Sequence, residues 1–148
     1  MQFSNMNIRN IAICLIEHDH HIFVAEGYDS VKQETFYRPL GGGIEFGETA
    51  GETAAEAAIR EFKEELDTEI SVQPDYQVYE NIFQYCGKLG HEVVFALKAQ
   101  FADDRFYDRR DFTANEGSLK FVARWVDKAE FISGNKILYP AGLSASLY

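Results

Sequence analysis

Residues 60–65 read Arg-Glu-Phe-Lys-Glu-Glu, and this stretch predicts a helix that carries an acidic stripe beside an apolar one. At about 100° per residue around a helix axis, Glu61, Glu64 and Glu65 fall on one flank. The side chain of Phe62 falls on the neighbouring flank, which the helix would bury. Like charges three and four residues apart cost roughly a few tenths of a kcal/mol per pair, so the acidic stripe is unfavourable unless a cation lies beside it.

Three consecutive glycines, Gly41, Gly42 and Gly43, precede this helix. Glycine lets the backbone approach a ligand closely, so a carbonyl of Gly42 or Gly43 could join the carboxylates around a metal. Mg²⁺ takes oxygen ligands and is usually held by a few carboxylates together with substrate phosphates. The glycines and the acidic stripe together predict a Mg²⁺ site, with Mn²⁺ as the alternative ion. The competing interpretation is a solvated, glutamate-rich helix face.

The pattern resembles the Nudix hydrolase family, in its MutT-like form. The family box is a glycine, five residues, a glutamate, seven residues, then Arg-Glu-apolar-any-Glu-Glu-any-Gly-apolar, and residues 60–66 match its second half. The resemblance implies an α/β (α+β) sandwich, with a mixed β-sheet packed between helices. We expect residues 1–148 to form a single domain of this kind, since about 150 residues make one domain.

The resemblance also implies an enzyme, a Nudix-type pyrophosphohydrolase that acts on acid anhydrides containing phosphorus. Its substrate would be a nucleoside diphosphate linked to another group, cleaved at the diphosphate linkage by attack of water on phosphorus. The pattern does not specify which nucleotide. The alternative is a catalytically inactive nucleotide-binding or sensor domain of the same fold.

A tandem repeat departs from the family box, because Gly-Glu-Thr-Ala occurs at residues 47–50 and again at 51–54. Counting back from Arg60 places the internal glutamate of the box on Glu52. Counting forward from the glycines places it on Glu48. The four extra residues are close to one helical turn, so an insertion inside the helix would rotate its face by only about 40°.

Two helix starts are consistent with this repeat. Both Thr49 and Thr53 are followed three residues later by a glutamate, which is the pattern of a capping box. The sequence therefore leaves open whether the repeat lengthens the helix or the loop before it. The box also ends in Asp67 and Thr68, where the family usually has glycine and an apolar residue, so the helix end is open as well.

Site roles follow from the resemblance at the matched positions. Glu61, Glu64 and Glu65 would bind the metal, and a carbonyl of Gly42 would join them. Glu61 or Glu64 would also act as general base. Arg60 would orient Glu61 or the upstream glutamate through charge-assisted hydrogen bonds, or else make only an ion pair on the helix surface.

Further candidates lie outside the box and would contact the substrate or the metal. Residues 103–118 read as a long loop, from which Glu116 is the candidate carboxylate, the alternative being a plain solvated loop. Glu92 is another candidate, the alternative being a charge on an edge strand. Tyr85 lies about where dinucleoside polyphosphate hydrolases of the family carry a tyrosine, and Arg38 lies just before the glycines.

Composition narrows the class of partner. A formal charge of −10 argues against binding to nucleic acid polymers, which relies on clustered Lys and Arg, whereas bound cations let an acidic site accept a small nucleotide. Apolar runs such as 11–16 are too short to span a bilayer, and residues 1–10 lack the apolar stretch of a secretory signal. We expect a cytoplasmic protein without a membrane partner, and a homodimer remains open.

Alternating apolar and polar residues, bounded by turn residues, predict most of the remaining elements. The predicted strands are 9–16, 22–26, 34–38, 76–85, 92–101 and 121–126. The predicted helices, besides the one that ends at residue 66, are 127–132 and a segment near 141–147.

Overall fold

The computed structural model describes residues 7–46 and 52–147. A four-stranded sheet has the order β5-β1-β7-β6, in which only β1 and β7 are parallel. Its strands are β1 (Arg9–Leu15), β5 (Gly41–Gly43), β6 (Ile70–Tyr85) and β7 (Lys88–Phe101).

A second, six-stranded sheet has the order β10-β4-β3-β9-β8, and β2 pairs with β3. Its strands are β2 (Glu17–His18), β3 (His21–Asp29), β4 (Glu34–Pro39), β8 (Asp111–Glu116), β9 (Leu119–Asp127) and β10 (Ile137–Leu138). This sheet is also mixed, because β10 runs parallel to β4, whereas its other strand pairs are antiparallel.

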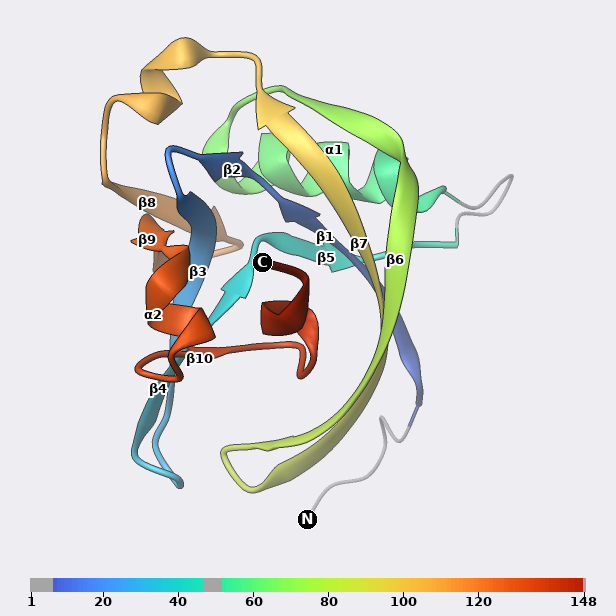
Figure 1. The fold of residues 1–148 in the computed structure, drawn as a ribbon. Coiled ribbons are helices and arrows are strands. Elements are labelled where there is room, and N and C mark those ends of the chain that lie inside the picture. Colours follow the sequence, from blue (N-terminus) through green and yellow to red (C-terminus); the bar gives the residue numbers. More distant parts are fainter. Residues whose placement is uncertain (1–6, 47–51, 148) are drawn as a thin grey trace.

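Helices cover both faces of the sheets (Figure 1). Alternate residues of β1 point to opposite faces. Ala12 and Cys14 join the core beneath α1 (Ala54–Leu66), and Ile11 and Ile13 join the core on the other side. That second core also holds buried residues of the three short C-terminal elements, namely α2 (Lys128–Ile132), β10 and η2 (Leu143–Leu147). The predicted α/β sandwich is therefore confirmed.

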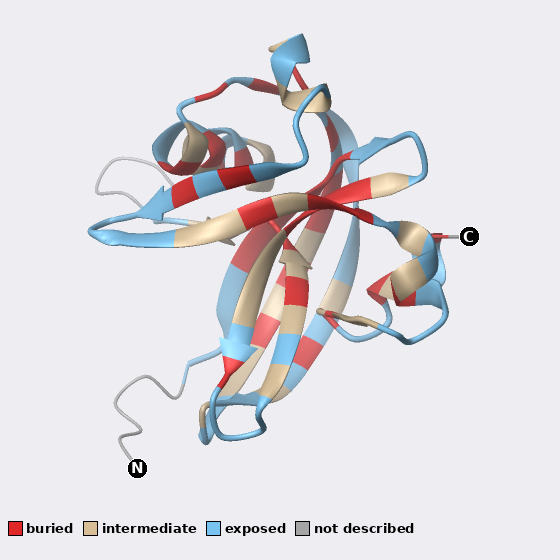
Figure 2. Cartoon of the chain, turned by 90° about the vertical axis from the view of Figure 1, so that its left-hand side faces the viewer, coloured by how far each residue is buried: buried red, intermediate tan, exposed pale blue. Residues whose placement is uncertain are grey.

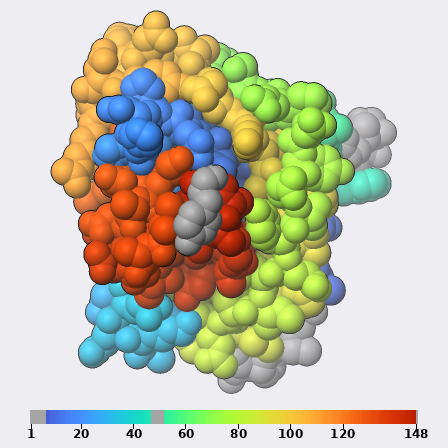
Figure 3. Space-filling view, viewed as in Figure 1, coloured from blue at the N-terminus to red at the C-terminus, as the bar shows by residue number. Residues whose placement is uncertain are grey.

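Burial is concentrated in the middle of the strands, and the hairpin turns are exposed (Figure 2). In the space-filling view the C-terminal segment lies between the second sheet and β6, where it closes the second core (Figure 3). Phe131, Leu143 and Leu147 pack there against residues of both sheets. Residues of both sheets contribute to each of the two cores. The two sheets therefore form one layer between α1 and the C-terminal elements.

Helix α1 begins at Ala54, because Thr53 caps it in an extended conformation. The Thr53 side chain accepts a hydrogen bond from the backbone N–H of Glu56, whose carboxylate accepts one from the backbone N–H of Thr53. Of the two predicted starts, Thr53 is the one that the helix uses, and Thr49 lies outside the described residues. Helix α1 therefore begins at the last residue of the repeat, Ala54.

Helix α1 ends at Leu66, where Asp67 adopts the left-handed conformation with φ 50° and ψ 46°. This is the conformation that glycine adopts most readily, and aspartate tolerates it better than most residues. Asp67, at the position of the family glycine, therefore ends the helix in the left-handed conformation that glycine favours. Thr68, at the apolar position of the box, is buried.

Most predicted strands are confirmed, and the exceptions have local causes. The stretch 103–118 is not a plain loop, because it contains the 3₁₀ helix η1 (Asp104–Tyr107) and strand β8, so Glu116 lies at the end of a strand. The glycines form the short strand β5 against β1. Strand β6 begins at Ile70, upstream of Pro74, because a register shift between Val72 and Tyr76 accommodates the proline.

Candidate metal and substrate site

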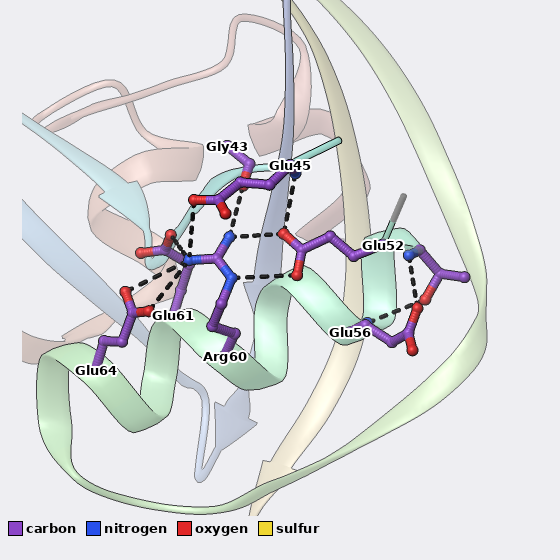
Figure 4. A network of polar contacts seen from close by, with 8 residues as sticks. Gly43, Glu45, Glu52, Glu56, Arg60, Glu61 and Glu64 are labelled. Carbon is purple, nitrogen blue, oxygen red and sulfur yellow. Dashed lines mark hydrogen bonds and ion pairs between the residues drawn. The ribbon is translucent and has the colours of Figure 1, made fainter. Parts of the chain in front are cut away.

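Arg60 connects α1 to the segments that precede it (Figure 4). Its Nη2 and Nε donate hydrogen bonds to the two carboxylate oxygens of Glu52, at 2.7 and 3.1 Å. Nη2 also donates to the carbonyl of Gly43, at 2.9 Å, and Nη1 donates to Oε1 of Glu61, at 2.8 Å. A single guanidinium therefore fixes the glycine strand, the helix entry and one site carboxylate relative to one another.

Glu52 occupies the place of the internal glutamate of the box. Its Oε1 accepts a hydrogen bond from the backbone N–H of Glu45, and its own N–H donates to the Glu45 carbonyl, both at 3.0 Å. Hydrogen bonds from Arg60 lower the pKa of the Glu52 carboxyl, so this carboxylate stays charged. The backward count from Arg60 is thus supported, and Glu48 lies outside the described residues.

Gly42 and Glu61 fit each other closely. A Cβ atom on Gly42 would lie 2.5 Å from Cδ of Glu61, so no other residue fits at this place without moving the carboxylate. Burial raises the pKa of Glu61, and the neighbouring Arg60 partly offsets the shift. The glycine strand therefore lets a partly buried carboxylate lie directly against backbone.

Glu65 is a buried carboxylate without compensation. It is 6% exposed, and its Oε1 has no hydrogen-bond partner among the described residues. Burial, reinforced by the charges of Glu61, Glu116 and Glu64, raises its pKa to about 8. Burying a charge is costly unless something pairs with it, and a divalent cation with oxygen preference meets that need.

The cavity beside these carboxylates has a volume of about 540 Å³ and is lined by Gly42, Glu61, Glu65 and Glu116. Glu116 reaches it from β8, close enough for its charge to raise the pKa of both Glu61 and Glu65. Glu64 does not line the cavity. Its side chain is 59% exposed and lies 3.4 Å from Nη1 of Arg60.

The donor set fits a hard cation, because it consists of carboxylate and carbonyl oxygens. Within residues 7–46 and 52–147, however, no three acidic, histidine or cysteine side chains already converge closely enough to hold an ion. Binding would therefore draw the carboxylates of α1 and β8 toward one another.

A cleft continues from this cavity between the sheets. Glu92 lies in it with a side chain that is 5% exposed, 3.4 Å from Nη2 of Arg38 and 4.0 Å from Nη1 of Arg9. Because β7 lies between β1 and β6, the interpretation of Glu92 as an edge-strand charge is wrong. Two arginines therefore face the cleft next to the carboxylate cavity, held by one buried glutamate.

Aromatic side chains line the far end of the cleft, a space of about 320 Å³ that Arg9, Arg38 and Glu92 also border. The ring of Phe36 lies 5.7 Å from the ring of Tyr85 and 5.6 Å from that of Tyr139, measured between centroids. Phe83 completes this lining. We call this space the aromatic chamber.

The structure thus brings most predicted site residues to one continuous cleft. Gly42, Glu61, Glu65 and Glu116 lie at one end, Arg38 in the middle and Tyr85 at the other end. Arg60 lies behind the carboxylates, and Glu64 on the outer side of Arg60.

Comparison with known families decides what this arrangement is. A family model described as NUDIX domain matches residues 6–141. The chain belongs to the NUDIX family. The predicted recognition and enzyme class, a Nudix-type pyrophosphohydrolase, are thereby confirmed, and the tandem repeat is a variation within a NUDIX domain.

Solved structures share the NUDIX fold at low sequence identity. A NUDIX hydrolase from Nitrosomonas europaea is 16% identical with a TM-score of 0.59, over 95% of this chain and 86% of that one. The MutT protein from Bacillus halodurans is 15% identical with a TM-score of 0.56, over 95% and 80%. The ORF135 protein of E. coli is 20% identical with a TM-score of 0.52, over 91% and 83%. The search of curated proteins found no match.

Three features of this NUDIX chain escaped sequence analysis. Arg9 and Tyr139 line the cleft although nothing in their neighbourhoods indicates a site, since both are placed by pairing with distant strands. The charged contacts of Glu92 likewise depend on the parallel pairing of β1 with β7.

In the part of the chain that the structure describes, no helix is long and apolar enough to cross a membrane.

Proposed function

We propose that this chain is a Mg²⁺-dependent pyrophosphohydrolase, with Mn²⁺ as an alternative ion, that cleaves the diphosphate linkage of a small nucleotide. The observation that carries the proposal is the buried Glu65 carboxylate, which lacks a hydrogen-bond partner among the described residues and faces Glu61 and Glu116 across an open cavity. A fold keeps such an unfavourable group where a ligand compensates for it.

The carboxylates of α1 would hold the cation. Glu65, Glu61 and Gly42 border the cavity, and Glu64 would have to leave its 3.4 Å contact with Arg60 to reach it. When bound, the cation supplies charge neutralisation at the phosphate oxygens and lowers the pKa of a bound water. Glu116 lies across the cavity as a further oxygen donor from β8.

Glu61 is our choice for the general base. Arg60 binds only its Oε1, so the other oxygen can accept the proton of the attacking water. Burial raises the pKa of Glu61, which makes it a better proton acceptor than an ordinary glutamate. Arg60, oriented by Glu52, fixes the direction of that carboxylate.

The middle of the cleft would bind the phosphates and the aromatic chamber would bind the nucleoside. Arg9 and Arg38 provide positive charge next to the metal cavity, where a diphosphate bridging the two regions needs it. Phe36, Phe83 and Tyr85 offer apolar ring surfaces, which suit a nucleobase. A small nucleotide therefore matches the order of chemistry along the cleft.

The test is product release from nucleoside triphosphates, nucleotide sugars, ADP-ribose and dinucleoside polyphosphates, with Mg²⁺, with Mn²⁺ and with a chelator. We expect metal-dependent turnover that falls at least about 100-fold in Glu64→Gln and in Glu65→Gln. Glu69→Gln is the matched control, because Glu69 is an exposed carboxylate just beyond the same helix. Equal rates in all three variants would refute the assignment of the site.

The rival within the family is a nucleotide sensor that has lost turnover, and the tandem repeat is the feature that favours it. Against it stands the Glu52–Arg60 pair, which keeps the two halves of the box together despite the repeat. Nucleotide binding without turnover of any substrate in the panel would establish the sensor.

A further inference from the structure

The turns of two hairpins lie near each other at the lower end of the molecule (Figure 1), where both border the aromatic chamber. One turn joins β3 to β4 and the other joins β6 to β7. Asp29 at the end of β3 connects them, because its Oδ2 accepts a hydrogen bond from the backbone N–H of Cys86 at 3.1 Å. Its Oδ1 accepts hydrogen bonds from the N–H groups of Val31 and Lys32 within its own turn, both at 3.0 Å. We call this arrangement the Asp29 clasp.

The Asp29 carboxylate of the clasp is buried and is bound by backbone groups. Asp29 is 2% exposed, and all three hydrogen bonds come from backbone N–H groups, with the bond from Lys32 contributing most to lowering its pKa. A second contact crosses the same junction, where the Tyr85 hydroxyl donates to the carbonyl of Tyr28 at 3.4 Å. The clasp therefore joins segments that are 57 residues apart in the chain.

Each hairpin contributes one phenylalanine to the aromatic chamber in the same way. The ring of Phe36 lies over Gly27, its partner across β3 and β4, where a Cβ atom would come within 2.5 Å of Cζ. The ring of Phe83 lies over Gly90, its partner across β6 and β7, where a Cβ atom would also collide with the ring. The relative position of the two hairpins therefore sets the position of the two rings.

We propose that Asp29 is a specificity-determining residue, because the clasp closes the chamber behind the nucleobase and fixes the two phenylalanine rings beside it. This inference rests on the proposed function and narrows its substrate class. The chain selects anhydrides whose nucleoside ends in the chamber with an unextended base. It discriminates against nucleotides whose base carries a bulky substituent on the edge that faces the clasp.

Equilibrium binding separates the nucleoside contribution from the phosphate contribution. The probes are α,β-methylene-ADP, α,β-methylene-UDP and methylenediphosphonate, which share a phosphonate bridge that resists hydrolysis, measured calorimetrically in Mg²⁺. In the unsubstituted protein we expect at least one nucleoside probe to bind about tenfold or more tightly than methylenediphosphonate.

Asp29→Asn isolates the link between the hairpins. The amide oxygen can still accept from Val31 and Lys32, whereas the amide nitrogen cannot accept from Cys86. We expect the preferred nucleoside probe to bind about five- to tenfold more weakly and methylenediphosphonate to bind within twofold of its original affinity. An N6-benzyl derivative of the adenine probe should bind the unsubstituted protein much more weakly than the parent probe, and Asp29→Asn should reduce that difference.

Two further variants test whether the effect of Asp29→Asn arises at the junction of the two hairpins. Asp103→Asn is the matched control, since Asp103 also accepts a backbone N–H two residues on but lies in the η1 segment, away from the chamber. Tyr85→Phe keeps the ring and removes only the second contact across the junction, so it should show a smaller effect in the same direction if Asp29→Asn does not fold.

Weakening of all probes alike by Asp29→Asn, or of none, would overturn the proposal. A nucleoside probe no tighter than methylenediphosphonate in the unsubstituted protein would also overturn it, while the hydrolase proposal would still stand on turnover. Conversely, absence of turnover together with nucleoside binding that depends on Asp29 would sink the hydrolase proposal and support the role of the clasp.

Discussion

The two ends of the cleft each contain a buried carboxylate, and the pKa values of the two are shifted in opposite directions. Glu65 is 6% exposed and Asp29 is 2% exposed. Burial and like charges raise the pKa of Glu65 to about 8, whereas three backbone N–H groups lower the pKa of Asp29. Hydrogen-bond partners, not burial, therefore decide the direction in which the pKa of each carboxylate shifts.

Removing Arg60 should break the carboxylate end most severely. Arg60→Ala leaves Glu52 and Glu61 without their cation, and Gly43 loses its donor. We expect turnover to fall about 1,000-fold and the free energy of unfolding to fall by roughly 2–4 kcal/mol, as for a partly buried ion pair that loses one partner. Denaturant unfolding and single-substrate kinetics measure the two effects.

Arg60→Lys is the companion variant. A lysine keeps the charge but cannot make the forked pair with Glu52, so it should recover less than a tenth of the lost turnover. Full recovery would show that charge alone, and not orientation, is what Arg60 contributes.

Metal binding should act on the carboxylate end alone. At a Mn²⁺ concentration 100 times its Kd, linkage predicts about 2.7 kcal/mol of added stability. We expect a clear rise in Tm for the unsubstituted protein and for Asp29→Asn, and a much smaller rise for Glu65→Gln. Differential scanning calorimetry with and without chelator provides the measurement, and an equal rise in Glu65→Gln would remove Glu65 from the ligand set.

The pH dependence of the metal-free protein should follow Glu65. A glutamate whose folded pKa is raised from 4.5 to about 8 prefers its neutral form in the fold. Stability is therefore greatest below the unfolded pKa and declines as pH rises from about 4.5 to about 8. Asp29, with a lowered pKa, contributes stability above its unfolded pKa of 3.8 that is lost as pH falls.

Glu65→Gln removes the ionisation and should flatten the stability curve between pH 5 and 8 in chelator. Thermal unfolding across this range measures it, with Glu69→Gln as the control that keeps the slope. The same decline in both variants would assign it to groups other than Glu65.

The smallest effect concerns Asp67, the C-cap residue of α1. Asp67 has a side chain that is 90% exposed, and its backbone is left-handed. Asp67→Gly relieves that conformation but gives up the 3.2 Å contact with Lys63, so we expect a gain of roughly 0.5 kcal/mol with turnover unchanged. A Tm that falls would show that the exposed ion pair outweighs the backbone preference.

Sequence analysis located the carboxylate end but only Tyr85 at the hairpin end, for a physical reason. Glu61, Glu64 and Glu65 share a helix flank, and this spacing brings Glu61 and Glu65 to the cavity, whereas Glu64 lies outside it against Arg60. Of the three hydrogen bonds of Asp29, two are local, and the third, from Cys86, joins residues 57 apart, which no local pattern reports. Strand β8 was taken for loop because its buried positions are only Phe112 and Ala114.

The hydrogen bonds between Glu45 and Glu52 explain how the chain tolerates its tandem repeat. They join Glu45, which precedes the repeat, to Glu52 in its second copy, so the place of Glu52 does not depend on a particular number of residues between the two. Lengthening a connection whose ends already meet costs little, about 0.6 kcal/mol for each doubling. The four extra residues can therefore be accommodated while Arg60 keeps its hydrogen bonds to Glu52 and Glu61.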